Sequence, residues 1–169
     1  MKTQVCGIIA SAPLCFPWGF DEEDEGCVAL KLILLHKITA LRAEGVKDFA
    51  VAMDDGIGLY AAEIINNLRE SDPEMTLLCV VPYEGQATKW PPNLRERYFT
   101  ELGKCSELAM VSTVETPGCR ITALLNVIDA ADLVLAVTSL EDVLTTVALH
   151  YGRRLAKQLA VIEPGTMNP

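Results

Sequence analysis

The segment from Phe49 to Glu63 constrains the fold of this chain more than any other part of the sequence. It joins a short apolar run to a tight turn containing glycine, and the turn leads into a helical pattern. A strand that passes through such a turn into a helix is typical of the crossovers in a parallel α/β sheet. Ligands of these sheets bind beyond the carboxyl ends of the strands, often against helix N-termini. The segment therefore predicts the scaffold of a nucleotide-type binding fold.

The same alternation of apolar runs and helical patterns continues along the chain. It predicts strands at residues 4–10, 48–53, 75–81, 107–112, 132–137 and 158–162. It predicts helices at residues 26–44, 57–70, 93–103, 119–130 and 141–155. We therefore expect a single α/β domain over residues 1–163, with a mostly parallel sheet of about six strands. Residues 164–169 are expected to form a loose C-terminal tail.

The predicted helix at 26–44 has apolar residues at helical spacing and stops at Gly45, a residue that suits a left-handed cap. The apolar positions are Val28, Leu32, Leu35 and Ile38 or Thr39. Lysine and histidine residues interrupt this segment, so it cannot supply the ~20 apolar residues that a membrane span needs. We therefore expect no membrane association.

The composition of the chain excludes some classes of protein. The chain has 169 residues, 50% of them hydrophobic, and a formal net charge of −9, which argues against a nucleic-acid partner. The acidic run at 21–25 is typical of a solvated loop. The six cysteines form no C-x-x-C pair and accompany no histidine cluster, so we expect no metal site. The apolar run before Ser11 is too short for a signal peptide, and we expect a reduced, cytoplasmic protein.

The run Glu84-Gly-Gln-Ala-Thr-Lys-Trp90 is the most specific of several recognisable segments. The others are 17–24, 61–63, 95–98, 116–119, Asp129 and 132–137. Together these segments, which cover nearly the whole chain, resemble the YpsA-like branch of the SLOG superfamily, a group that also contains DprA-type and LOG-type proteins. The resemblance implies a Rossmann-like three-layer α/β/α fold and a cytosolic protein that binds a nucleotide or a nucleotide derivative. The YpsA-like members are largely uncharacterised as enzymes.

The chain departs from the family pattern at the turns that would hold a phosphate. The first loop of the family resembles T-G-x-[RK]-P, but here Ala10 and Ala12 stand at the glycine and at the basic position. The second turn of the family resembles G-M-A-x-G-x-D. The corresponding turn here, at 52–58, lacks the acidic residue at the end of that motif and carries two acidic residues earlier in the turn. Counted without a gap, an Arg-Asn pair of the family falls on the Ala-Leu pair at 123–124, and a Gly-Gly-Thr turn falls on Val-Leu-Thr at 143–145.

The change at the last of these turns matters most for anion binding. A helix N-terminus binds phosphate because its free N–H groups and its dipole face the anion. Glu141 and Asp142 place carboxylates at that position, and Val143 and Leu144 add side-chain bulk. Like charges a few ångström apart repel by ~1 kcal/mol in water and by more near a protein surface, and no obvious Lys or Arg offsets this. We expect an altered phosphate site, in which the two acids cap the helix.

Asp54 and Asp55 follow the second predicted strand, where α/β enzymes keep catalytic or metal-binding acids. Capping of the next helix is the commoner role for such residues, and a magnesium site would need further oxygen ligands. Gly56 suits a tight turn that leaves no room for a Cβ atom. Thr138 and Thr145 are candidates for contact with a small polar ligand, although turn and cap positions are more usual for threonine.

Four aromatic residues and one amide lie near the predicted strand ends. Trp18, Tyr60, Tyr83 and Trp90 are placed to stack on a base-like ring, or alternatively to pack two long loops over the sheet. Gln86 is placed to donate a hydrogen bond to a ligand, although loop amides more often bond to the backbone. The sequence contains neither the G-x-S-x-G nucleophile elbow nor the glycine-rich signature of LOG phosphoribohydrolases. No catalytic residue is therefore assigned.

These observations leave three functional interpretations open. The first, which we favour, is a SLOG-type protein that binds or senses a small, nucleotide-derivative-like ligand through an altered and less anion-selective site. The second is an enzyme that acts on a nucleotide-like substrate through Asp54, Asp55 or Glu63. The third is a non-catalytic subunit that pairs with itself, as a homodimer, or with a relative. No cofactor is established by the sequence, and a nucleotide or its derivative is the candidate.

Overall fold

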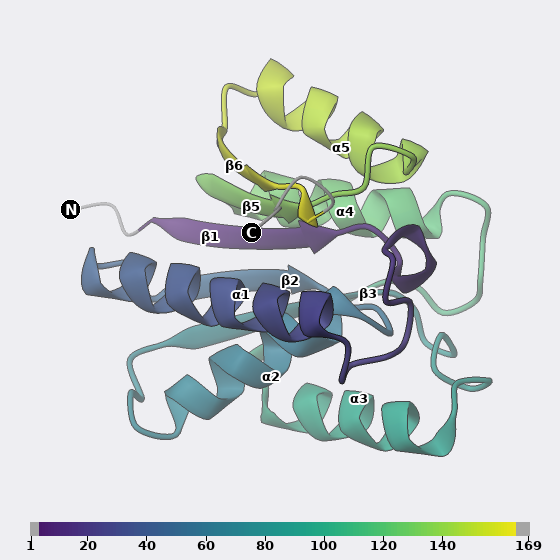
Figure 1. Ribbon diagram of the computed structural model, residues 1–169. Helices are drawn as coiled ribbons and strands as arrows, with labels where there is room; N and C mark the ends of the chain where they lie inside the picture. Colours follow the sequence, from purple (N-terminus) through teal and green to yellow (C-terminus); the bar gives the residue numbers. More distant parts are fainter. Residues whose placement is uncertain (1–3, 165–169) are drawn as a thin grey trace.

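The computed structural model describes residues 4–164. In it the apolar segments of the chain form strands, and helices alternate with these strands (Figure 1). The strands are β1 Val5–Ala10, β2 Asp48–Ala52, β3 Thr76–Tyr83, β4 Glu107–Ser112, β5 Leu133–Val137 and β6 Gln158–Ile162. The helices are α1 Glu25–Ala43, α2 Ile57–Arg69, α3 Pro92–Lys104, α4 Cys119–Ala130 and α5 Val143–Arg154. A short 3-10 turn, η1 Pro13–Cys15, follows β1 and is an addition to the predicted pattern. Residues 165–169 of the expected tail lie outside the described residues.

The strands form one parallel sheet in the order β4-β3-β2-β1-β5-β6. The central strands are apolar on both faces because helices cover both sides of the sheet. Ile8 of β1 lies beside Val51 of β2 on one side and beside Leu135 of β5 on the other. The chain reverses its direction of travel across the sheet between β1 and β5, which is the place where ligands of such sheets bind.

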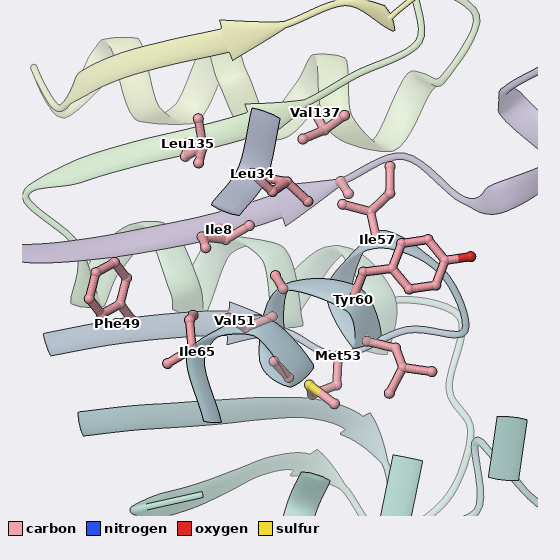
Figure 2. Close-up of a cluster of buried hydrophobic side chains, with 14 of the residues drawn as sticks. Ile8, Leu34, Phe49, Val51, Met53, Ile57, Tyr60, Ile65, Leu135 and Val137 are labelled. Atoms are coloured by element: carbon pink, nitrogen blue, oxygen red, sulfur yellow. The ribbon is translucent and has the colours of Figure 1, made fainter. Parts of the chain in front are cut away.

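Two helical layers enclose the sheet, which confirms the predicted Rossmann-like three-layer fold. Helices α1, α2 and α3 cover one face, and α4 and α5 cover the other (Figure 1). On the first face, Leu34 of α1 and Ile57 of α2 pack against Ile8 and Val137 (Figure 2). On the second face, Val127 of α4 is fully buried within a smaller core. None of the helices in residues 4–164 combines the length and the apolar character that a membrane crossing requires.

The predicted helix at 26–44 forms as α1, but a different apolar stripe of this helix faces the core. The buried residues are Cys27, Leu30, Leu34 and Ile38. Val28, Leu32 and Leu35, whose spacing predicted the helix, are 43%, 61% and 39% exposed. Helix α1 therefore carries apolar residues on its solvent side as well as on its core side.

The acidic loop before α1 is anchored by an ion-pair network, although the sequence suggested a solvated run. Both carboxylate oxygens of Glu22 accept hydrogen bonds from Arg97 of α3, at 2.7 and 2.8 Å, and Lys31 of α1 lies 2.7 Å from the same carboxylate. Arg97 also pairs with Glu63 of α2 at 2.7 Å. These contacts hold the pKa of Glu22 at about 2, mainly through the hydrogen bonds from Arg97. The loop is thereby tied to three helices, and Glu63 has a structural partner.

Candidate functional site

A pocket of about 110 Å³ lies at the carboxyl ends of β1, β2 and β3. The turn after β2 forms one wall, and the first turns of α4 and α5 close the other sides. The lining residues are Ala10, Ala12, Ala52, Met53, Asp54, Asp55, Pro82, Arg120, Ala123, Leu124, Asp142 and Leu144. The pocket therefore lies where the Phe49–Glu63 segment predicted a site, and it contains three carboxylates and a guanidinium group.

Asp54 borders the pocket and also caps α2. Its Oδ1 atom accepts hydrogen bonds from the backbone N–H groups of Gly56 at 2.9 Å and Gly58 at 2.8 Å. Gly56 holds the N-cap position of α2, and the Asp54 carboxyl, two residues before it, accepts the first-turn N–H that a capping side chain would bind. Burial raises the pKa of the carboxyl from 3.8 to about 7, although the two backbone hydrogen bonds act in the opposite direction. A carboxyl group with a pKa near neutrality exchanges its proton within the physiological range.

Two glycines allow the turn after β2 to approach its surroundings closely. A Cβ atom on Gly58 would overlap the carbonyl oxygen of Ala52, which is a fixed backbone atom. A Cβ atom on Gly56 would lie 2.6 Å from Cγ of Pro13, in the loop that follows β1. These contacts hold the turn and the first loop against each other and fix the wall of the pocket between them. The structural role expected for Gly56 is confirmed.

Arg120, on the first turn of α4, is a pocket residue that the sequence analysis missed. Its guanidinium carbon lies 5.9 Å from the centre of the Tyr83 ring, and its charge acts on Asp55 across the pocket. Burial raises the pKa of the Asp55 carboxyl, and Arg120 partly offsets this effect. A signal was present in the sequence, because a basic residue in the first turn of a helix opposes the helix dipole and is unusual without an anionic neighbour.

The N-terminus of α5, where a phosphate would be expected in this fold, is occupied by side chains of the protein itself. Asp142 caps the helix by accepting a hydrogen bond from the backbone N–H of Leu144 at 3.2 Å, as predicted, whereas Glu141 is exposed. Thr145 donates to Asp142 Oδ2 at 2.9 Å, and the fully buried Ser11 lies 3.0 Å from Thr145 Oγ1. Because Thr145 uses its proton on Asp142, Ser11 is the donor in the second contact.

Ser11 extends this chain of hydrogen bonds across the reversal point of the sheet. Its Oγ accepts from the backbone N–H of Ser139 at 3.0 Å, and its own N–H donates to the carbonyl of Val137 at 2.9 Å. Ser11 thus ties the end of β1 to the end of β5 and to the first turn of α5. Thr145, which is 1% exposed, serves this network.

The predicted aromatic residues and the amide lie outside the lining of the pocket. Trp18 is buried and stacks on Phe16, and Tyr60 is buried beneath the ion-pair network, with Lys31 Nζ 4.3 Å from the ring centre. Trp90 packs edge-on against Tyr98, at 4.9 Å between the ring centres. These contacts match the alternative in which the aromatic residues pack the long loops.

Gln86 has the backbone partner that loop amides usually have. Its Nε2 atom donates to the carbonyl of Met53 at 3.2 Å and to the hydroxyl of Tyr98 at 3.0 Å. The amide therefore holds the 84–91 loop onto the end of β2. Its Oε1 atom is buried without a hydrogen-bond partner among the described residues.

Thr138 lines a second hollow, of about 320 Å³, beyond the carboxyl end of β5. This hollow runs between the 3-10 turn after β1 and the loop after β5, and Cys15, Phe16 and Glu141 also line it. Its lining shares no residue with that of the first pocket, although Glu141 of this hollow and Asp142 of the first pocket are neighbours in the chain. Within residues 4–164, no group of three or more His, Cys, Asp or Glu side chains is placed to hold a metal ion.

Comparisons with known proteins match the central part of the chain. A family model for YpsA, described as the YspA SLOG family, matches residues 12–137. A UPF0398 protein of Halalkalibacterium halodurans is 29% identical over 79 residues, which are 47% of this chain and 42% of that protein. A UPF0398 protein of Bacillus velezensis is 29% identical over 85 residues, and the UPF0398 protein YpsA of Bacillus subtilis is 24% identical over 85 residues. Each of these two matches covers 50% of this chain and 47% of the relative. The chain thus spans less than half the length of these curated relatives.

Proposed function

Because the chain belongs to the YpsA SLOG family, we propose that it binds a small polar ligand at the carboxyl ends of β1, β2 and β3, in a site altered so that it no longer favours a phosphate. The ligand is neutral or positively charged and is no larger than a nucleoside. The observation that carries this proposal is the charge of the pocket. Its described lining contains the carboxyl groups of Asp54, Asp55 and Asp142, of which Asp54 is partly protonated near neutral pH, and one cation, Arg120.

The capped end of α5 supports the exclusion of phosphate. The backbone N–H of Leu144 is engaged by the carboxylate of Asp142, so a phosphate at this helix end would meet a negative charge in place of a free donor. The exposed carboxylate of Glu141 lies one residue away and adds to the repulsion. Arg120 is the one counter-charge in the described lining, and Asp55 already faces it.

The size of the pocket supports the proposed upper limit on the size of the ligand. Pockets for drug-sized ligands usually enclose ~300–1,000 Å³, whereas this one encloses about 110 Å³. A nucleobase or the ribose of a nucleoside is closer to this size than a complete nucleotide. Hydrogen-bond donors of such a ligand match the carboxylates of Asp54 and Asp55, and a carbonyl oxygen matches Arg120.

A thermal-shift series tests this proposal. Nucleobases, nucleosides and the corresponding monophosphates are compared at equal concentrations, with wild-type protein, Arg120→Gln and, as a control, Arg95→Gln on the exposed side of α3. A ligand present at ~100 times its Kd raises the Tm of a domain of this size by about 5–10 °C. We expect this rise with a nucleobase or nucleoside, a smaller rise in Arg120→Gln, and no change in Arg95→Gln. A larger rise with the monophosphates than with the nucleosides would contradict the proposal.

The raised pKa of Asp54 favours a second candidate function, an enzyme that uses this residue as a general acid or base. A carboxyl group with a pKa near 7 inside a pocket is typical of such catalysts. Burial raises the pKa of the Asp54 carboxyl to about 7. Incubation with nucleosides and chromatography of the products tests this function. Turnover that is lost in Asp54→Asn while the ligand still binds would favour catalysis over binding alone.

A further inference from the structure

The second hollow, which Thr138 lines, lies at the point where the order of the strands reverses. Residues 15–17, after β1, form one wall, and the loop after β5 forms another. Ligands of parallel α/β sheets bind at such reversal points. The volume of about 320 Å³ falls within the range of ~300–1,000 Å³ that is usual for small-molecule sites. The hollow can therefore hold a molecule of its own, besides the ligand of the first pocket.

Thr138 brings to this hollow a hydroxyl group that the protein itself leaves unused. The residue is 5% exposed, and its backbone N–H donates to the carbonyl of Ile162 at 2.9 Å. Its Oγ1 atom has no hydrogen-bond partner among residues 4–164, and the small exposed part of the residue faces the hollow. Hydroxyl groups of buried residues normally have a partner. This hydroxyl group therefore indicates a bound molecule as its partner.

The charge of the hollow indicates what kind of molecule this is. The described lining contains the carboxylates of Glu141 and Glu163 and no Lys, Arg or His side chain. The thiol of Cys15, which also lines the hollow, responds to negative charge. Its pKa is raised, first by burial, then by the charge of Asp142 and to a smaller extent by that of Glu141. A surface with this potential favours a positively charged ligand.

An organic cation suits this lining better than a metal ion. Within residues 4–164, no three His, Cys, Asp or Glu side chains are grouped so as to hold a metal. Phe16, Pro17 and Leu140 give the hollow an apolar wall, and Leu140 is 81% exposed. We propose that the hollow binds a small alkylammonium ion. Its N–H groups donate to Thr138 Oγ1 and to the carboxylate of Glu141, and its hydrocarbon chain covers the apolar wall.

A titration of the full chain, followed by two-dimensional ¹H–¹⁵N NMR spectroscopy, tests this site. The probe is the butylammonium ion, which is protonated at neutral pH as a lysine side chain is. Butanol, which has the same chain without the charge, and tetramethylammonium, a cation without N–H donors, are compared with it at constant ionic strength. We expect saturable shifts of the backbone amide signals of Thr138, Ser139 and Glu141 with butylammonium alone.

Three results of this titration would overturn the proposal. Shifts centred on Gly56 and Gly58 would place the ion in the first pocket. Equally strong binding of butanol or tetramethylammonium would show that the hollow does not recognise a charged N–H donor. The absence of saturable binding would leave water as the partner of the Thr138 hydroxyl group.

Two variants test the individual contacts. Thr138→Val should raise the Kd for butylammonium about 10-fold, because a charged donor loses its acceptor. Glu141→Gln should raise it about 3-fold, because an exposed ion pair contributes less. Thr100→Val and Glu96→Gln, matched changes on the exposed side of α3, should leave the Kd unchanged. Since the Thr138 hydroxyl has no partner in the described part of the chain, Thr138→Val should also keep the Tm of wild type. A lower Tm, or an unchanged Kd in Thr138→Val, would contradict the proposed contact.

Discussion

The titration of Asp54 gives the sharpest test of how the turn after β2 is built. The folded-state pKa of this carboxyl is about 7, raised by burial from an ordinary value of 3.8. Between these values the folded state holds a proton that the unfolded state has lost. The free energy of unfolding therefore falls as the pH rises from ~4 to ~7, and this loss is complete above the folded-state pKa. Asp54→Asn removes the titration but keeps an oxygen that can accept from Gly56 and Gly58.

The size of the effect follows from the difference between the two pKa values. A difference of about three pKa units corresponds to ~4 kcal/mol, of which about two thirds falls between pH 5 and pH 8. Asp54 borders the pocket, where water screens its charge, so we expect about half of the part that falls between pH 5 and pH 8, or ~1.3 kcal/mol. The free energy of unfolding of Asp54→Asn, taken relative to that of wild type, should therefore rise by ~1.3 kcal/mol when the pH is raised from about 5 to about 8.

Urea unfolding at these two pH values measures this gain directly. Glu141→Gln is the control, because Glu141 is an exposed acid at the same edge of the sheet, and its difference from wild type should stay nearly constant. Asp54→Ala separates the cap from the titration, because loss of the cap costs about 1 kcal/mol at both pH values. If the difference between Asp54→Asn and wild type is the same at both pH values, the argument from burial is wrong.

Three further predictions test other parts of the structure. Gly58→Ala should lower the free energy of unfolding by ~1–3 kcal/mol, because its Cβ atom would overlap the Ala52 carbonyl oxygen. Gly103→Ala, whose Cβ atom meets open space in α3, should raise the free energy of unfolding by ~0.5–1 kcal/mol. Thermal unfolding of the two variants measures both changes. A double-mutant cycle of Glu22→Gln and Arg97→Met should give a coupling of ~1–2 kcal/mol near neutral pH. This coupling should be lost as the pH falls from about 4.5 towards 2, because the folded-state pKa of Glu22 is lowered; a coupling that persists near pH 2 contradicts the ion pair. Ser11→Ala should cost ~1–3 kcal/mol in chemical unfolding, because the partly buried N–H of Ser139 loses its acceptor, and a neutral result would exclude that role.

The fold could be predicted because its pattern is local. Apolar strands alternate with helical segments along the chain, and each predicted element lies within two residues of the observed one. The capping roles of Asp54 and Asp142 were also predictable, since a cap lies next to the helix that it serves. Both predictions depend only on residues that are close in the sequence.

Features that depend on distant residues were harder to predict. Arg120 reaches the pocket because α4 crosses behind β1, β2 and β3, and its spacing from Asp55 in the sequence does not indicate that contact. Glu22 belongs to an apparently solvated acidic run, yet its partner Arg97 lies 75 positions away. In α1 the sequence contains two apolar stripes, so helical periodicity predicted the helix but could not indicate which stripe meets the sheet.

The link from Ser11 to Thr145 also joins the two hollows at the carboxyl edge of the sheet into one mechanical unit. Ser11 bonds to the loop after β5 at Ser139 and to the first turn of α5 at Thr145. Between these two points the chain contributes Glu141 to the lining of the larger hollow and Asp142 to the lining of the pocket that contains Asp54 and Arg120. A displacement of this single turn therefore changes the shape of both hollows together.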